Sequence, residues 1–185
     1  MNRTVAIHSL GCKVNSYEAE SMEQLLKQAG YTIVPFDENI TADIYIINTC
    51  SVTNIADRKS RQMLHKSKNA IVVAAGCYVN ADTKKAAEDN AVDIVLGNNC
   101  KINIVEALEN YYKDKNNSEM VVDFKEKQEY EELKLDEVST HTRAYIKIQD
   151  GCNQFCSYCI IPYTRGRIRS RAIEDVVDEV RRLSD

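Results

Sequence analysis

Hydrophobic and polar positions alternate with two different periods along residues 1–112. Five short apolar runs, typical of buried strands, lie at residues 4–10, 31–36, 43–49, 71–76 and 93–98. Four helices are predicted between or after them, at residues 16–29, 54–68, 82–89 and 101–112. The link after the second run, DENITA, is too short for a helix.

Strands that alternate with helices predict an α/β fold, built on a parallel sheet with helices on both faces. The simplest such topology is a flavodoxin-like open sheet with strand order 2-1-3-4-5. Asn15 and Glu18 have the spacing of a capping box at the start of the first helix, and Gly30 suits the position just after its end.

The pattern changes after residue 112. Residues 113–140 are strongly charged and weakly alternating, so we interpret them as an acidic linker, a solvated spacer with one or two edge strands. Residues 141–150 then predict a new strand. A strongly amphipathic helix follows, with Ser170 as its expected N-cap, and its apolar positions are Ile173, Val176, Val177, Val180 and Leu183. One strand, one loop and one helix bury little surface, so we expect residues 141–185 to be the start of a larger domain.

The number of cysteines and the lack of a signal or membrane-spanning segment indicate the compartment and the role of the thiols. The chain has seven cysteines, an odd number, and no N-terminal signal pattern. No stretch reaches the roughly 18 apolar residues of a membrane span. Cysteines in such a chain more often bind metal than form disulfides. We therefore expect a soluble cytoplasmic protein with no membrane partner.

Three cysteines follow three different strands: Cys12 the first, Cys50 the third and Cys77 the fourth. Neighbouring strands are about 4.8 Å apart, and the carboxyl ends of parallel strands share one edge of the sheet. We expect these thiols to meet there and bind metal, although each alone would suit a small buried hydrophobic residue. Cys100 follows a more distant strand and is interpreted as a free thiol.

The other three cysteines lie within eight residues, as C-x3-C-x2-C in the run CNQFCSYC, at Cys152, Cys156 and Cys159. One loop can therefore place three sulfurs around one metal centre. A structural zinc site needs a fourth ligand, such as His141 or a distant cysteine. An iron–sulfur cube held at three corners would leave its fourth iron open. The residues alone leave both alternatives open.

Together with the aromatic Tyr158, this spacing resembles the signature of radical S-adenosylmethionine enzymes. The runs SLGCKVNSYEAE, NTCSVTNIADRKSRQ and GCNQFCSYCIIPYTRGRIRSR resemble the methylthiotransferases, over nearly the whole chain. Lys13, Val14 and Tyr17 favour the threonylcarbamoyladenosine tRNA branch over the branches that act on isopentenyladenosine tRNA or ribosomal protein S12.

The resemblance implies two [4Fe-4S] clusters. The auxiliary cluster would be held by Cys12, Cys50 and Cys77. The cluster that binds S-adenosylmethionine would be held by Cys152, Cys156 and Cys159, with Tyr158 near the adenine. The implied architecture is an N-terminal methylthiotransferase domain at residues 1–112, the linker, and the first strand, loop and helix of a radical-SAM partial (β/α) barrel.

The implied activity is insertion of a methylthio group at C2 of N6-threonylcarbamoyladenosine-37 in tRNA, with hydrogen taken from C2 by a 5′-deoxyadenosyl radical. The implied partners are tRNA and an electron donor such as flavodoxin or ferredoxin, and we expect a monomer. No catalytic residue is assigned beyond the cluster ligands, and the chain by itself is expected to be inactive. A non-catalytic iron–sulfur or zinc module is the alternative from a different class.

A basic run, TRGRIRSR, follows the second group of cysteines. It holds Arg165, Arg167, Arg169 and Arg171 and no acidic residue. Such a run suits tRNA phosphates or the carboxylate of S-adenosylmethionine, but a solvated loop has the same composition. The sequence assigns these arginines no role.

Overall fold

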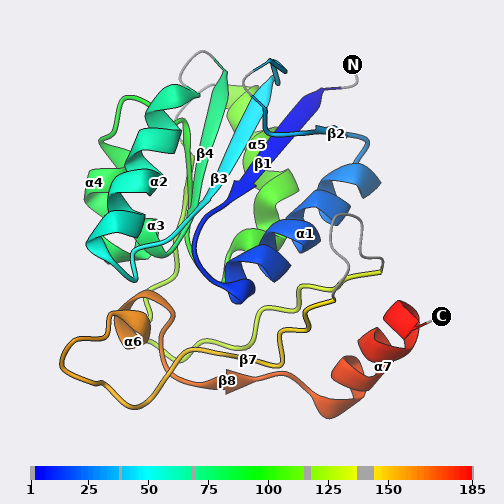
Figure 1. Cartoon of the computed structure of the whole chain (residues 1–185), viewed down its shortest axis with the longest axis vertical. Coiled ribbons are helices and arrows are strands. Elements are labelled where there is room, and N and C mark those ends of the chain that lie inside the picture. The colour runs from blue at the N-terminus through cyan, green and yellow to red at the C-terminus, as the bar shows by residue number, and fades with distance from the viewer. Residues whose placement is uncertain (1–2, 38, 68–69, 115–117, 137–143, 185) are drawn as a thin grey trace.

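The fold is a six-stranded parallel sheet with helices on both faces (Figure 1). It was obtained as a computed structural model, which describes residues 3–37, 39–67, 70–114, 118–136 and 144–184. The strand order is β2-β1-β3-β4-β5-β6, so the predicted order is confirmed and one edge strand is added. The strands are β1 (Thr4–Ser9), β2 (Thr32–Val34), β3 (Ile44–Thr49), β4 (Ile71–Gly76), β5 (Ile94–Leu96) and β6 (Ser118–Met120).

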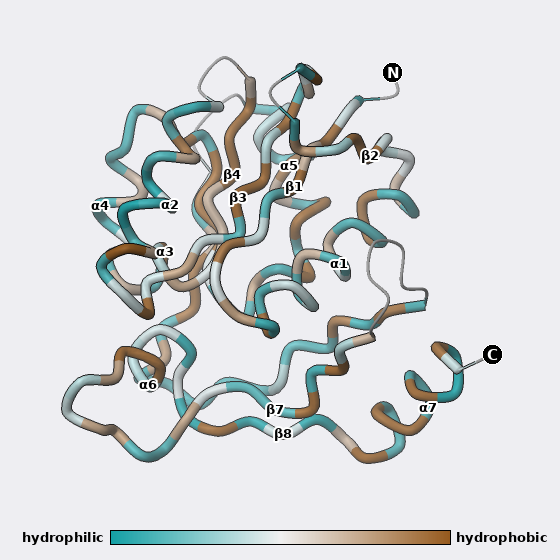
Figure 2. Tube along the Cα trace, viewed as in Figure 1, coloured by the Kyte–Doolittle hydropathy of each residue, from teal (hydrophilic) through white to brown (hydrophobic). Residues whose placement is uncertain are grey.

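The helices form one layer on each face of this sheet. Helices α1 (Lys13–Gln28) and α5 (Ile104–Asp114) cover one face, the latter preceded by the 3-10 turn η1 (Lys101–Asn103). Helices α2 (Asn54–Lys66), α3 (Cys77–Ala81) and α4 (Thr83–Ala87) cover the other face. Successive strand side chains point to opposite faces. Ile46 therefore packs under α1 and α5, whereas Ile47 packs under α2 and α3. Figure 2 shows the hydrophobic positions concentrated along the strands.

Helix α1 begins earlier than the sequence predicted. It starts at Lys13, with Cys12 in the N-cap position and no capping bond from its side chain. Asn15 and Glu18 lie inside the helix, and both are completely buried. The predicted capping box is therefore wrong, because these two side chains have partners from distant parts of the chain.

Part of the segment after α5 packs against helix α1. Beyond β6, Leu133 and Leu135 are buried in a small cluster with Tyr17 of α1. The Tyr17 hydroxyl donates a hydrogen bond to the carbonyl of Leu133 at 2.7 Å. The expectation of a solvated spacer is wrong for this stretch, since alternate leucines face α1.

The C-terminal segment passes across the carboxyl ends of the sheet strands (Figure 1). A two-residue strand, β7 (Gln149–Asp150), pairs antiparallel with β8 (Arg169–Ser170), and α6 (Ile161–Thr164) lies in the loop between them. In the described residues, β7 is the whole of the predicted 141–150 strand. Residues 141–143 lie outside them.

The last helix is α7 (Ile173–Ser184). Its existence was predicted correctly, but its expected cap was not, because Ser170 lies in β8. Three apolar side chains on α7, those of Ile173, Val177 and Val180, are exposed. None of the described helices is long and apolar enough to cross a membrane.

Candidate metal centres

Cys12, Cys50 and Cys77 follow strands β1, β3 and β4 and lie at the carboxyl edge of the sheet. Thr49 pairs with Gly76 across β3 and β4, so Cys50 and Cys77 leave the sheet side by side. A Cβ placed on Gly11 would lie 2.5 Å from the sulfur of Cys50, so the backbone before Cys12 passes directly over that sulfur. Cys50 and Cys77 are buried, whereas Cys12 is exposed.

All three donors of this first group are cysteine thiols. Within the described residues, no three His, Cys, Asp or Glu side chains converge tightly enough to hold one metal ion. A zinc ion needs donors within about 2.3 Å of one point, whereas an iron–sulfur cube spreads its ligands over separate corners. A set made of thiols is the one that iron–sulfur centres prefer. The assignment of these three ligands stays a prediction.

Two buried amides fix the loops that carry these cysteines. The side-chain amide of Asn15 donates to the carbonyls of Leu10 at 2.7 Å and Thr49 at 2.8 Å, so it ties together the residues that precede Cys12 and Cys50. The amide nitrogen of Asn98 lies 3.5 Å from the sulfur of Cys77. Sequence reasoning missed Asn98 and assigned Asn15 to a cap.

Cys50 has other thiols beside it, whereas Cys100 lies apart from the first group of cysteines. Burial raises the pKa of the Cys50 thiol, a backbone hydrogen bond from Val52 opposes this, and the neighbouring Cys77 and Cys12 thiols raise it further. Burial also raises the pKa of Cys100, to about 11. Cys100 lies in the hydrophobic core under α5. A thiol in that place behaves as a small hydrophobic side chain.

The second group of cysteines lies on the loop between β7 and α6. The backbone N–H of Cys152 donates to the carbonyl of Gly166 at 3.0 Å, and that of Cys159 to the carbonyl of Cys156 at 2.9 Å. Gly151 has φ +78°, and a side chain there would collide with the backbone of residue 167. Cys156 is exposed, and Cys152 and Cys159 are half-buried. These ligands also stay a prediction, and His141, the alternative fourth ligand for zinc, lies outside the described residues.

An open pocket of about 700 Å³ lies beside this loop. Phe155 and Tyr163 line it from the cysteine side, and Phe124 and Asn80 are among the residues that line the rest. Tyr158 does not line this pocket and is 91% exposed. Its predicted place near an adenine stays a prediction.

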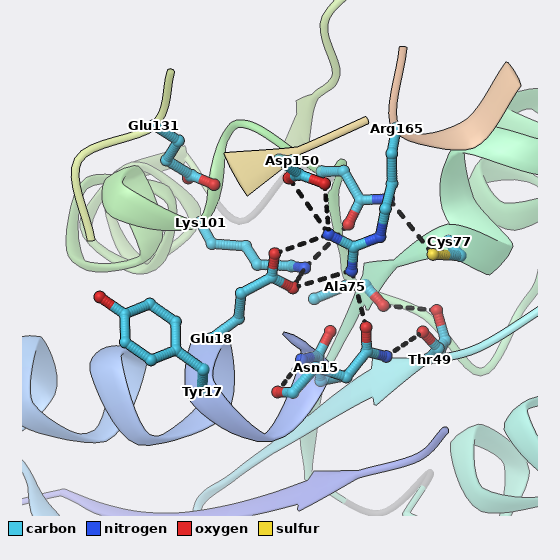
Figure 3. A network of polar contacts seen from close by, with 12 residues as sticks. Asn15, Tyr17, Glu18, Thr49, Ala75, Cys77, Lys101, Glu131, Asp150 and Arg165 are labelled. Atoms are coloured by element: carbon cyan, nitrogen blue, oxygen red, sulfur yellow. Dashed lines mark hydrogen bonds and ion pairs between the residues drawn. The ribbon is translucent and has the colours of Figure 1, made fainter. Parts of the chain in front are cut away.

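A buried ionic network lies beside Cys77, between helix α1 and the C-terminal segment (Figure 3). The guanidinium of Arg165 donates to Glu18 at 2.9 Å and to Asp150 at 3.1 Å. Lys147 bridges the same two carboxylates, at 2.8 Å each, and Lys101 pairs with Glu18. None of these five side chains is more than 4% exposed. Burial by itself would raise the pKa of Glu18, but Arg165, Lys101 and Lys147 together hold it well below its ordinary value.

The basic run is divided between two environments. Arg165, Arg169 and Arg171 are buried, whereas Arg167 is exposed. Arg171 pairs with Glu179 of α7, and Arg169 lies 3.6 Å from Asp150. Three of the four arginines therefore face carboxylates of this chain. The sequence could not show this, because the carboxylates lie elsewhere in the chain.

The chain is similar to known proteins over nearly its whole length. It is 40% identical, over 98% of its length, to threonylcarbamoyladenosine tRNA methylthiotransferase MtaB of Bacillus subtilis (strain 168), of which it covers 41%. It is 36% identical to the protein of the same name from Aquifex aeolicus (strain VF5), over 97% of the chain and 44% of that protein. It is 33% identical to tRNA-2-methylthio-N(6)-dimethylallyladenosine synthase of Anaplasma phagocytophilum (strain HZ), over 100% of the chain and 42% of that protein. The chain thus spans less than half the length of these relatives, and the similarities confirm the predicted resemblance.

A solved structure shares the fold. It is the radical S-adenosylmethionine methyltransferase TsrM from Kitasatospora setae, with tryptophan substrate and a SAM analogue bound. The TM-score is 0.56 at 12% identity, over 97% of this chain and 45% of that one, which supports the predicted fold class. Residues 4–97, the part that contains the first group of cysteines, match a family model. The chain belongs to the family described as Uncharacterized protein family UPF0004.

Proposed function

We propose that this protein is a tRNA methylthiotransferase of the radical-SAM type, which inserts a methylthio group at C2 of N6-threonylcarbamoyladenosine-37. The observation that carries the proposal is the pair of separate cysteine groups, one at the carboxyl edge of the sheet and one on the loop after β7. The 40% identity to the Bacillus subtilis methylthiotransferase supports this substrate. Because the chain spans 41% of that relative, the activity is proposed for the whole protein.

In this proposal each group of cysteines holds one cluster. Cys12, Cys50 and Cys77 hold the auxiliary [4Fe-4S] cluster, and Cys152, Cys156 and Cys159 hold the cluster that binds S-adenosylmethionine. When bound, the clusters and S-adenosylmethionine supply the electron, the radical and the sulfur chemistry.

The protein's own contribution is position and the exclusion of water. Burial of Cys50 and Cys77 keeps solvent from the inner side of the first site. The exposed Cys156 and the open pocket beside Phe155 leave room for small ligands at the second site. We also propose an electron donor such as flavodoxin or ferredoxin, a monomeric state and a cytoplasmic location.

The test is mass spectrometry of tRNA nucleosides from a strain that lacks the gene. We expect 2-methylthio-N6-threonylcarbamoyladenosine to disappear and to return when the full-length gene is supplied. Full-length protein with Cys50→Ala should fail to restore it. The matched control is Cys100→Ala, which removes a buried thiol from the hydrophobic core under α5. Full-length protein with this change should restore the nucleoside.

A second candidate substrate is the isopentenyladenosine-modified tRNA. It is favoured by the 33% identity to the Anaplasma phagocytophilum synthase over the whole chain. The same measurement separates the two. Loss of the methylthio group from the isopentenyl nucleoside, with the threonylcarbamoyl nucleoside unchanged, would replace the preferred substrate with this one.

A further inference from the structure

The buried ionic network carries more positive than negative charge. Its cations are Lys101, Lys147, Arg165 and Arg169, whereas the carboxylates that pair with them are those of Glu18 and Asp150. These side chains are at most 7% exposed, so water screens them poorly. The excess remains when Glu131 is counted, a buried carboxylate that accepts a hydrogen bond from the backbone of Ile102.

An excess of buried positive charge is costly unless a negative group lies beside it. The first group of cysteines is in that position. Arg165 donates through its second terminal nitrogen to the amide oxygen of Asn15 at 2.7 Å, and the same oxygen lies 3.8 Å from the sulfur of Cys12. One amide atom thus separates the guanidinium from a predicted ligand.

A second amide makes the same connection on the other side of the site. The amide oxygen of Asn98 accepts a hydrogen bond from Lys101 at 2.8 Å. Its nitrogen lies 2.8 Å from the carbonyl of Thr164, the residue before Arg165, and 3.5 Å from the sulfur of Cys77. Burial by itself would lower the pKa of Arg165, but Glu18 and Asp150 raise it well above its ordinary value, and Cys77 adds a smaller effect in the same direction.

We infer that this network is the counter-charge of the first cysteine site and that Arg165 is a positioning residue that sets the site's reduction potential. The inference deepens the proposed function and rests on it, because it requires that Cys12, Cys50 and Cys77 bind a cluster. Thiolate ligation gives such a centre net negative charge, and reduction makes it more negative. The buried guanidinium of Arg165, held nearby by two carboxylates, favours the more negative, reduced state. The side-chain amides of Asn15 and Asn98 lie between the network and the cysteines and orient both.

A purely structural clamp would behave differently. A clamp weakens whenever any member is removed, whatever the sign of the lost charge. A counter-charge instead makes the potential fall when a cation is removed and rise when a carboxylate is removed. The sign of the shift therefore separates the two roles.

The experiment is an anaerobic redox titration followed by electron paramagnetic resonance. The whole chain carries Cys152→Ala, Cys156→Ala and Cys159→Ala and is reconstituted with iron and sulfide, so that the signal comes from the first site. We expect Arg165→Met to lower the reduction potential of the cluster. At a fixed solution potential the ratio of reduced to oxidised cluster should fall at least tenfold, which corresponds to a shift of about 59 mV for a one-electron couple. We expect Asp150→Asn to raise the potential and Arg165→Lys to keep most of the parent value.

The matched control is Arg167→Met, which removes an exposed arginine two residues away in the same run and should leave the potential unchanged. If Arg165→Met fails to fold, the upward shift in Asp150→Asn carries the test. Unchanged potentials, shifts of the same sign in both variants, or unfolding of both would overturn the inference. A parent chain that binds no iron would overturn the proposed function and this inference together, whereas a cluster with an insensitive potential would overturn this inference alone.

Discussion

Asn15 and Glu18 show how far a residue's role can depend on partners that are remote in sequence. Their spacing predicts a capping box, since both residue types favour helix starts. The structure instead buries them, because Arg165 lies 147 positions after Glu18 and binds both. No local pattern contains that information. The cysteines, by contrast, could be grouped from the sequence, since each lies directly beyond a strand or within one short loop.

Removing the shared carboxylate should strongly destabilise the fold. Glu18→Gln leaves three buried cations without their common partner, and we expect a loss of about 3–5 kcal/mol in the free energy of unfolding. Because the pKa of Glu18 is lowered in the fold, its contribution is complete above its ordinary pKa of 4.5 and is lost as the pH falls from there towards the lowered value. Urea unfolding between about pH 6 and pH 3 measures both effects.

In that series the parent should lose stability on acidification more steeply than Glu18→Gln. Glu131 acts in the opposite sense, since burial raises its pKa and its contribution is lost as the pH rises through that value. Equal slopes for parent and variant would contradict the assignment of Glu18 as the ionised centre of the network.

Among the elements, the strands of the sheet were the most predictable. Apolar runs such as those of β3 and β4 are recognisable as buried strands from the sequence. In a parallel sheet the carboxyl ends of such strands then lie along the same edge. The strand before the second cysteine loop was predicted too long. Its described part is two residues because it pairs with β8, which is equally short. That pairing follows from the turn at Gly151 and Gly166, whose positive φ angles no periodicity reveals.

Gly11 offers a test of how closely the two loops at the first site approach each other. Its φ of +99° strains any other residue, and an added Cβ would lie 2.5 Å from the sulfur of Cys50. We expect Gly11→Ala to cost more than about 1 kcal/mol of stability and to lower the iron bound at the first site. Urea unfolding and iron analysis measure the two effects.

Gly30→Ala is the matched control. Gly30 also has a positive φ, +87°, but an added Cβ there would meet nothing within 4 Å. It therefore reports backbone strain alone. Equal stability losses and unchanged iron binding in both variants would show that the contact over Cys50 has no effect.

At the scale of the whole molecule, helix α1 connects the two cysteine sites. Cys12 precedes it, Asn15 and Glu18 contact the segment after β7, and Tyr17 binds Leu133 and Glu179 of α7. The two sites are thus held in one arrangement. Their predicted ligands nevertheless come from separate groups of cysteines, so we expect each site to bind its cluster by itself.

Cys156→Ala tests that independence. We expect the parent, after anaerobic reconstitution, to hold about eight irons in two cubes and the variant to hold about four. The control is Cys100→Ala, which should keep the parent content. Loss of iron from both sites in Cys156→Ala would show that the second loop is needed to build the first site.

The distance in sequence between Glu18 and Arg165 has a consequence for assembly on the ribosome. At synthesis rates of about 5–20 residues per second, roughly 7–30 s pass before the guanidinium follows the carboxylate out of the exit tunnel. Until then, either helix α1 does not dock fully on the nascent sheet, or the Glu18 carboxylate is buried without the Arg165 guanidinium. Stable closure of the first cysteine pocket, and with it the loading of any metal centre there, therefore has to wait until Arg165 has left the ribosome.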